Sequence, residues 1–410
     1  MAEIFPFKAI VYNPIGGRDV SSLVAPPYDV IDPGDRARLM ARDQHNIARL
    51  VLPEPSGGLS KYENAARQYK SWKNNAVLSI DDNPALYVWE QRFKIAGQDY
   101  TRRALVAKVS AKPYAVGGVM RHEHTHAGPK ADRLALFQAT GAQFSQMFGI
   151  FPDQGGSVTE LLLRASEGSA MIQANGDDGQ RSRLFRINDR AAVARLRELL
   201  APQTITMADG HHRYETTLAY YEQIGRDGTT LMALVPDSDP GLVVLPTHRV
   251  INLPEYPSVV ANLTGSGFTV RQYDLDQWER QYREAEEDHQ KRSVVAVSPS
   301  QNRTDVISWS ADGKVDAIYR SSGDVGVLHA VILKTLARAD DTSTPLDFTY
   351  IHEADAAVAE AGKQGACAFL LRPISVRLLL KLAERQEVMP AKSTYFFPKF
   401  LSGFVSAELD

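Results

Sequence analysis

Five consecutive residues constrain the fold of this 410-residue chain more than any other segment: Asp209-Gly210-His211-His212-Arg213. The β-branched and apolar run 204–207 before them is typical of a buried strand, and the apolar positions 214, 218 and 221 after them recur at helical spacing. We therefore expect the chain to turn from a strand into a helix here. A helix N-terminus presents unpaired N–H groups and a positive dipole end, a glycine lets an anion approach the backbone, and an arginine binds phosphate oxygens through two N–H groups. The segment thus predicts a phosphate-binding turn. In the alternative interpretation, Asp209 only caps the helix and the histidines face solvent.

The bulk composition is that of a globular protein and argues against some classes of function. Hydrophobic residues make up 44% of the chain and charged residues 23%, so this length supports two or three domains with their own cores. The formal net charge of −3 lacks the basic excess that is typical of nucleic-acid binding. The single cysteine, Cys367, excludes an intramolecular disulfide, and the N-terminus lacks the pattern of a signal peptide. No apolar run approaches the roughly 20 residues of a membrane helix, so we expect a cytoplasmic protein without nucleic-acid or membrane partners. The oligomeric state is left open.

Hydrophobic spacing predicts helices and strands along the whole chain. We expect strands at residues 7–12, 85–93, 100–109, 204–207, 230–235, 242–250 and 294–297, with hairpins joining 85–93 to 100–109 and around 312–313. Apolar stripes predict helices near residues 62–72, 131–140, 190–200, 211–225, 275–285, 325–336 and 378–382, the last capped by Ser375. These elements predict an α+β protein with mixed sheets and a soft domain boundary near residue 255. The segment Ala25–Ile31 is stiff and extended because its two prolines fix φ, and its role is either structural or site-forming.

The segment His122-Glu123-His124-Thr125-His126 matches the H-E-x-x-H pattern of zinc hydrolases. That chemistry requires both histidines on a helix that runs past them, and a third metal ligand. Glycines at 117 and 118 and the pair Gly128-Pro129 disfavour such a helix, and no third ligand stands at a recognisable spacing. We therefore expect a loop here, with Pro129 in the first turn of the next helix. A zinc hydrolase that uses His122, Glu123 and His126 is kept as an alternative.

A glutamate on a loop is available as a general base. Phosphoryl transfer needs mostly positioning and charge neutralisation, together with one group that orients or deprotonates the attacking hydroxyl. The chain has no Walker-type G-x-x-x-x-G-K-[ST] motif, so bound phosphates need another site, such as residues 209–213. For Glu123 itself, the alternative is an ordinary solvated side chain.

Three separated segments together resemble the free L-serine kinases of the ParB/sulfiredoxin-like superfamily. Ala208–Arg213 is similar to the D-G-H-H-R nucleotide signature of that superfamily, and Arg121-His122-Glu123 is similar to the P-H-E loop that carries the kinase's catalytic glutamate. Glu387–Thr394 is similar to the kinase's C-terminal segment, whose lysine and second hydroxyl residue hold the amino-acid substrate. The three segments occur in the same order as in the kinases. The full-length pattern resembles a large, uncharacterised bacterial and archaeal family related to them.

The resemblance implies a fold, ligands and site residues. It implies a ParB/sulfiredoxin-like nucleotide-binding core at residues 116–255 and a C-terminal α/β domain (256–410) that closes the substrate site. Residues 1–115 have no equivalent in the kinases, and we expect them to form an N-terminal α+β segment packed on this core. It implies Glu123 as the catalytic base and Asp209 as a catalytic charged partner near the phosphates or Mg²⁺. The nucleotide-binding residues that it implies are His122, Gly210, His211, His212 and Arg213. The donor would be ADP or ATP with Mg²⁺, which suits a site of one or two carboxylates and phosphates.

The acceptor site departs from the kinase pattern. The kinases have an aromatic residue on the strand after the nucleotide helix and a histidine after the lysine and threonine, where this chain has Pro246–Arg249 and Tyr395-Phe396. We expect the substrate-binding residues to be Lys392, Ser393, Thr394, His248 and Arg249. A cation at the end of a strand suits a carboxylate or phosphate. For the last two residues, a surface pair at a strand end is the alternative.

The leading hypothesis is a kinase that transfers a phosphoryl group from ADP or ATP to the hydroxyl of a free amino acid, L-serine first, giving O-phosphoserine. The alternative from another class is a non-catalytic nucleotide-binding switch, as in the chromosome-partitioning members of the superfamily. The absence of a recognisable basic helix-turn-helix weakens a DNA-loading version of that switch. The kinase hypothesis depends on Glu123 and the turn at Asp209 meeting around a polyphosphate.

Overall fold

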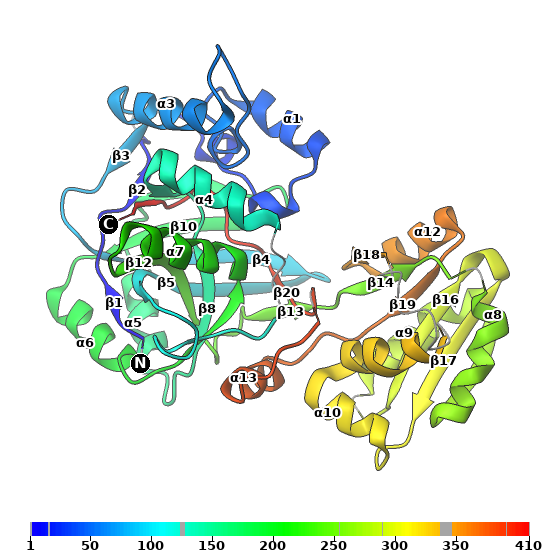
Figure 1. Cartoon of the computed structure of the whole chain (residues 1–410). Coiled ribbons are helices and arrows are strands. Elements are labelled where there is room, and N and C mark those ends of the chain that lie inside the picture. Colours follow the sequence, from blue (N-terminus) through cyan, green and yellow to red (C-terminus); the bar gives the residue numbers. More distant parts are fainter. Residues whose placement is uncertain are drawn as a thin grey trace. The chain divides into compact units, whose positions relative to one another are not determined.

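A computed structural model of the chain describes residues 2–14, 17–123, 128–253, 255–288, 290–336, 347–390 and 392–409. The chain folds into two compact units (Figure 1). Unit 1 comprises Met1–Arg121, Thr125–Val243 and Phe396–Asp410, and unit 2 comprises His122–His124 and Val244–Tyr395. Most of unit 2 is therefore an insertion in the sequence of unit 1. The strands β13 (Val243–Leu245) and β20 (Tyr395–Phe397) lie at the two ends of that insertion.

The sequence predicts a boundary near residue 255 and one C-terminal domain, whereas in the structure the segment after residue 395 belongs to unit 1. Local hydrophobic spacing identifies a strand or a helix, but not the core on which it packs. The return of the last residues to unit 1 is therefore visible only in three dimensions.

Nine strands among the described residues of unit 1 form one mixed sheet. Their order is β6-β11-β8-β12-β5-β4-β10-β9, and β1 pairs with β5. β8 runs parallel to β12 and antiparallel to β11, and β11 runs parallel to β6. The strands are β1 (Ile4–Phe5), β4 (Leu86–Ile95), β5 (Gln98–Ala111), β6 (Val119–Met120), β8 (Met147–Phe151), β9 (Ile172–Asn175), β10 (Arg181–Ile187), β11 (Ile205–Asp209) and β12 (Gly228–Pro236).

The long hairpin of β4 and β5 confirms the predicted pairing of the two alternating segments. Its register pairs Ile95 with Gln98 across a two-residue turn. Both turn residues, Ala96 and Gly97, have positive φ, as a type I′ hairpin turn requires. Residues 1–115 thus contribute β1, β4 and β5 to the same sheet as β8, β11 and β12.

Helices and two short ladders complete unit 1. The hydrophobic core of the sheet includes side chains of α5 and α6, while α7 packs against α4, and α4 against α3 (Figure 1). The helix predicted to begin near Pro129 is α4. The helices are α1 (Pro33–Arg42), α2 (Ala48–Val51), α3 (Lys61–Asn74), α4 (Gly128–Thr140), α5 (Ser157–Ala165), α6 (Arg190–Leu200) and α7 (His211–Ile224). The ladders pair β2 (Ile10–Tyr12) with β3 (Leu78–Ile80), and β7 (Ala142–Gln143) with β21 (Ala407–Glu408).

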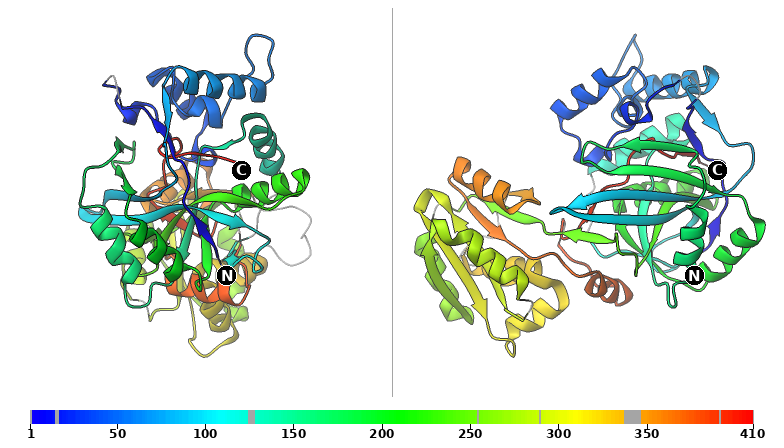
Figure 2. Two further views of the ribbon diagram at one scale, coloured as in Figure 1. Left: turned by 90° about the vertical axis from the view of Figure 1, so that its left-hand side faces the viewer. Right: turned by 180° about the vertical axis from the view of Figure 1, so that it is seen from behind.

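Unit 2 is a sheet between two helical layers (Figure 2). Its described strands follow the order β15-β17-β16-β19-β14-β18, with antiparallel pairing throughout. Alternate residues of β16 face opposite cores, because Val294 packs with α8, α10 and α11 and Val295 packs with α9 and α12. The strands are β14 (His248–Ile251), β15 (Phe268–Asp274), β16 (Ser293–Ser298), β17 (Arg303–Trp309), β18 (Phe348–Ile351) and β19 (Cys367–Leu370). The helices are α8 (Tyr256–Val259), α9 (Trp278–Glu287), α10 (Lys314–Val327), α11 (Leu333–Leu336), α12 (Ala354–Gln364) and α13 (Val376–Glu384).

Two details of unit 2 differ from the sequence-based prediction. The hairpin predicted around residues 312–313 is wrong, because β17 ends at Trp309 and α10 begins at Lys314. An Asp-Gly pair suits either kind of turn, and here Gly313 is the N-cap of a helix. The strand predicted at 242–250 is two strands, β13 and β14, separated at Pro246, which cannot donate to a ladder. The cap at Ser375 is confirmed, since its side chain accepts from the backbone of Leu378.

The prediction of an α+β protein is confirmed by this architecture, in which the unit 1 sheet is mixed and the described strands of the unit 2 sheet are antiparallel. None of the helices formed by the described residues is both long and apolar enough to cross a lipid bilayer.

Candidate functional site

The predicted turn from strand to helix lies in unit 1. β11 ends at Asp209, Gly210 is the N-cap residue with φ 93°, and α7 begins at His211. A glycine cap has no side chain that could accept from the first N–H groups of the helix. A Cβ on residue 210 would lie 3.2 Å from the guanidinium of Arg213 and 3.2 Å from Met147, so glycine suits both the backbone conformation and the space.

Asp209 is held by two cations. One carboxylate oxygen lies 2.7 Å from the ammonium of Lys399, and the other lies 2.7 Å from Nη2 of Arg213. Burial alone would raise the pKa of Asp209, but the charges of Lys399 and Arg213 lower it well below its ordinary value. The carboxylate is therefore ionised at neutral pH. Because one carboxylate faces two cations at a helix N-terminus, the turn has the charge that an anion requires.

The side chains of the first helical turn differ in burial. Arg213 is buried and donates from Nη1 to the carbonyl of Gln146, which fixes its guanidinium beside Asp209. His211 is also buried, and His212 is half-buried. The structure therefore brings Asp209, Gly210 and Arg213 together around one point, as the sequence predicts, and adds Lys399.

A buried polar network holds the segment that carries Lys399. Arg102 is fully buried and donates from Nη1 to the carbonyl of Phe397 at 3.2 Å and from Nη2 to that of Pro398. The carbonyl of Lys399 itself accepts from the side-chain amides of Gln91, at 3.3 Å, and Gln180, at 3.0 Å. Burial lowers the pKa of Arg102 to about 9, so the guanidinium stays charged at neutral pH. Lys399 is thus attached at its backbone to the strands of the main sheet.

The stiff segment Ala25–Ile31 lies near the same turn. Its backbone pairs with Ser402, through bonds of 3.3 and 2.7 Å that exchange the N–H and carbonyl groups of Ala25 and Ser402. Burial raises the pKa of Tyr28, whose ring also lies 4.2 Å from the guanidinium of Arg133. The charges of Arg213 and Asp209 act on Tyr28 as well. These contacts give the segment a structural role, and its site-forming role stays a prediction.

In unit 2 the structure joins the two segments that were predicted to hold the acceptor. Glu123 forms a parallel bridge with Met389, whose N–H donates to the carbonyl of His122 at 2.8 Å. The imidazole Nε2 of His122 lies 3.0 Å from the hydroxyl of Thr394. His122 is fully buried and Glu123 is half-buried. The predicted base and the predicted substrate segment therefore meet, although more than 260 residues separate them in the sequence.

Arg249 and His248 leave β14 in opposite directions. Arg249 is 1% exposed and donates from Nη2 to the carbonyl of Lys392 at 3.0 Å, so it lies beside the predicted substrate segment. The next side chain of that segment, Ser393, donates to the carbonyl of Pro390. The imidazole Nδ1 of His248 accepts from the backbone of Leu371, and burial lowers its pKa to about 3, so this histidine is neutral. The structure thus connects Arg249, but not His248, with Lys392.

The described residues contain no group of three or more histidine, cysteine, aspartate or glutamate side chains arranged to hold a metal ion. His126, the second histidine of the zinc pattern, lies outside the described residues, and the described Glu123 belongs to a β-bridge. Asp209 fits poorly as a direct ligand of Mg²⁺, because both of its oxygens already contact a cation. The juxtaposition of Glu123 with Asp209 stays a prediction, since the two residues belong to different units.

Sequence reasoning missed Lys399, Arg102 and Tyr28 as neighbours of the turn. Lys399 lies in the apolar run 396–401. A lone lysine in an apolar run indicates a buried charge that needs a partner, and this was the signal that the sequence offered. Arg102 stands in an alternating strand, where its burial has no local signature.

Comparison with solved structures gives distant matches. A free serine kinase in complex with AMP is 12% identical, with a TM-score of 0.37, and the match covers 71% of this chain and 86% of the kinase. A conserved hypothetical protein from Pyrococcus furiosus is 13% identical, with a TM-score of 0.35 and coverage of 72% and 93%. C-terminally truncated SbnI from Staphylococcus aureus is 8% identical, with a TM-score of 0.35 and coverage of 72% and 85%.

No curated protein matches the sequence. One family model does, the one described as "Protein of unknown function (DUF1015)", and it matches residues 4–319. Since this match spans well over half of the sequence, the chain belongs to the DUF1015 family.

Proposed function

We propose that this protein is a small-molecule kinase that transfers a phosphoryl group from ADP or ATP to the hydroxyl of a free amino acid, L-serine first, giving O-phosphoserine. The observation that carries the proposal is the turn at the start of α7, where Lys399 and Arg213 flank the carboxylate of Asp209. The similarity of Ala208–Arg213 to the D-G-H-H-R signature supports the same function.

The nucleotide phosphates would bind at this turn in unit 1. Gly210 would allow close approach of a phosphate to the N-terminus of α7, and the two cations would neutralise its charge. Such groups supply what phosphoryl transfer chiefly needs, namely position and charge stabilisation. Because Asp209 fits poorly as a metal ligand, Mg²⁺ would be held by the nucleotide phosphates.

The acceptor would bind in unit 2, where Glu123, Lys392 and Thr394 are brought together by the backbone contacts of residues 122–123 with 389 and of Arg249 with Lys392. The Glu123 carboxylate accepts the proton of the acceptor hydroxyl as its oxygen forms the new bond to phosphorus. The bond from phosphorus to the leaving oxygen of the nucleotide breaks in the same displacement. Burial of His122 and its contact with Thr394 fix the backbone that carries the base.

The proposal is tested by incubating the full-length protein with L-serine, Mg²⁺ and either ADP or ATP, and by detecting O-phosphoserine with ³¹P NMR. We expect product with one of the two donors. Glu123→Gln should abolish turnover and leave nucleotide affinity unchanged, because the base does not hold the nucleotide. Glu384→Gln is the matched control, an identical change at an exposed position of α13, and should keep full activity.

The absence of product with both donors and a panel of hydroxy amino acids would show that the proposed kinase function is wrong. If nucleotide then still bound tightly at the turn, the non-catalytic nucleotide switch would replace it. Full activity of Glu123→Gln would leave the kinase function standing but would show that Glu123 is not the base.

A further inference from the structure

Unit 2 contains a cavity of about 390 Å³ at the start of β14. Volumes in this range are typical of small-molecule sites. Part of its wall is apolar, from residues such as Val325, Leu371 and Leu378, and part carries the hydroxyls of Thr247, Ser375 and Ser393. The charged lining residues are Arg249, Arg320, Arg372, Glu286 and Asp324.

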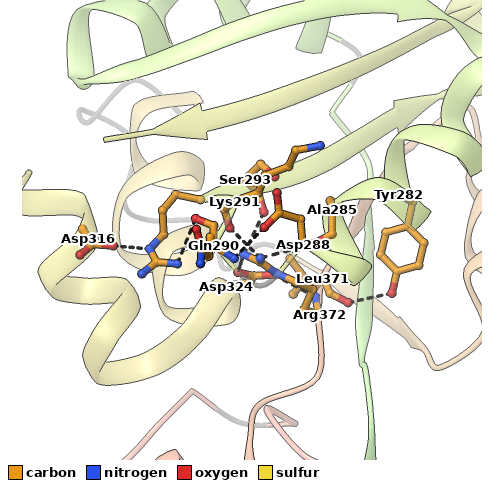
Figure 3. A network of polar contacts seen from close by, with 11 residues as sticks. Tyr282, Ala285, Asp288, Gln290, Lys291, Ser293, Asp316, Asp324, Leu371 and Arg372 are labelled. Atoms are coloured by element: carbon orange, nitrogen blue, oxygen red, sulfur yellow. Dashed lines mark hydrogen bonds and ion pairs between the residues drawn. The ribbon is translucent and has the colours of Figure 1, made fainter. Parts of the chain in front are cut away.

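Two of the three arginines already have carboxylate partners. Arg372 donates to Asp324 from Nε at 2.9 Å and from Nη2 at 2.7 Å, and it also donates to backbone carbonyls of Lys291 and Ser293 (Figure 3). Arg320 forms an ion pair with Asp316, and its side chain is 65% exposed. Neither arginine therefore needs a ligand to balance its charge.

Arg249 is different, because it is buried without an ion pair to any described residue, and Tyr350 and Glu123 act on it only through longer-range attraction. No carboxylate of the described residues lies within 4.0 Å of its guanidinium, although only 1% of the residue is exposed. Of its five N–H groups, two donate to the carbonyls of Thr247 and Lys392, and the buried Nε has no partner in the structure. Burial lowers the pKa of Arg249 to about 10, so it remains protonated at neutral pH. A buried, charged group with free donors on the wall of a cavity is unfavourable unless an anion occupies that cavity.

We infer that Arg249 binds the carboxylate of a small hydroxy or amino acid in this cavity. Arg372 is paired with Asp324 and Arg320 with Asp316, so Arg249 is the lining arginine without an ion pair among the described residues, and one bound carboxylate would supply it. The planar guanidinium offers the parallel N–H groups that a carboxylate accepts. Thr247 and Ser393 line the same cavity, and hydroxyl side chains suit the polar groups of such a molecule.

This inference extends the proposed function, since it names a group that the acceptor carries. The identity of the bound molecule as the acceptor rests on that function, whereas the binding itself does not. Binding is therefore measured on the full-length protein without nucleotide.

Isothermal titration calorimetry with L-serine, D-glycerate, ethanolamine and inorganic phosphate tests the inference. Ethanolamine is serine without its carboxylate. We expect L-serine or D-glycerate to bind the unmodified protein and ethanolamine to give no heat. Arg249→Met should weaken that binding by at least about tenfold, because two charged hydrogen bonds are lost. Arg249→Lys keeps the charge but loses the two parallel N–H groups of the guanidinium. Its affinity should lie between those of the unmodified protein and Arg249→Met.

Arg320→Gln is the matched control, because Arg320 lines the same cavity and already has a partner, and it should bind within about twofold of the unmodified protein. Thermal unfolding of each ligand-free variant shows whether it folds. If Arg249→Met does not fold, Arg249→Lys is used to test the inference. Equal binding of ethanolamine, binding of phosphate alone, or serine affinity unchanged in both Arg249 variants would overturn the inference. If the protein is a kinase and substitution of Arg249 leaves its KM for serine unchanged, the inference is wrong but the proposed function stands. If the protein binds the carboxylate through Arg249 but shows no turnover, the inference stands but the proposed function is wrong.

Discussion

The ammonium of Lys399 lies 2.7 Å from a carboxylate oxygen of Asp209, although 190 residues separate them in the sequence. The contact is mostly shielded from solvent, with side-chain exposures of 13% and 19%. It supplies one of the two cations that keep Asp209 ionised, and it adds positive charge to the turn that we propose for nucleotide phosphates.

Replacing Lys399 by methionine should destabilise the protein and weaken nucleotide binding. We expect a loss of about 1.5–3 kcal/mol in the free energy of unfolding, because a charged hydrogen bond in a shielded site disappears while Arg213 still pairs with Asp209. Urea denaturation and nucleotide titration measure the two effects. Lys73→Met is the control, since Lys73 lies at the same 2.7 Å from Glu408 in a more exposed pair and should cost about 0–1 kcal/mol. Equal losses for the two variants would contradict the role of Lys399.

Arg102→Met should displace the segment that carries Lys399. The change leaves the buried carbonyls of Phe397 and Pro398 and the amide oxygen of Gln91 without their donor, and we expect a cost of about 2–5 kcal/mol. Nucleotide affinity should fall together with stability. Arg92→Met removes an arginine from the same hairpin, but its side chain is 53% exposed, so about 0–1 kcal/mol is expected. Unchanged nucleotide affinity in a folded Arg102→Met protein would show that the network does not place Lys399.

Gly210→Ala should be more harmful than the same change at the other end of α7. Both Gly210 and the C-cap residue Gly225 have positive φ, but only at Gly210 does a Cβ meet other atoms within 4 Å. We expect about 1 kcal/mol of destabilisation for Gly225→Ala, and about 2–3 kcal/mol for Gly210→Ala, where crowding against Arg213 is added. Thermal unfolding of the two variants provides the comparison. A smaller effect at Gly210 would mean that the turn relaxes freely.

Acid should weaken the contact between Asp132 and its partners in unit 1. Burial alone would raise the pKa of Asp132, but hydrogen bonds from Lys61 and Arg133 lower it to about 2. A depressed pKa gives stability that is complete above the unfolded value, about 4, and is lost as the pH falls toward 2. Urea denaturation between pH 5 and pH 2 should therefore show a smaller acid-induced loss for Asp132→Asn than for the unmodified protein. Asp99→Asn, at an exposed hairpin position, should follow the unmodified curve, and coincidence of all three curves would refute the prediction.

Local sequence patterns predict the turn at residues 209–213, but they do not predict which distant residues surround it. The strand before Asp209 and the helix after Arg213 follow from spacing within about 20 residues, a range over which periodicity is informative. Lys399 and Arg102 contact residues that are far from them in the sequence, and no periodic pattern predicts which buried cation will pair with which carboxylate. The same limit explains why the return of residues 396–409 to unit 1 was not predicted.

The acceptor segments show a different limit. Their grouping came from the similarity of residues 121–123 and 387–394 to the kinases, and the structure places Glu123 beside Met389. The separate environments of His248 and Arg249 could not be predicted, because the two residues are adjacent in the sequence and both were assigned to one ligand. Alternation along β14 sends them to different sides, which becomes clear only once the bounds of the strand are known.

The insertion of residues 244–395 between the main part of unit 1 and its last segment bears on how the chain assembles. Loop-closure entropy grows only logarithmically, by about 0.6 kcal/mol for each doubling of length, so the native state tolerates so long an excursion at small thermodynamic cost. Folding rates are more sensitive, since contacts between distant residues form slowly. We therefore expect the last strand segment to dock on unit 1 late, after the strands that surround Asp209 have already come together.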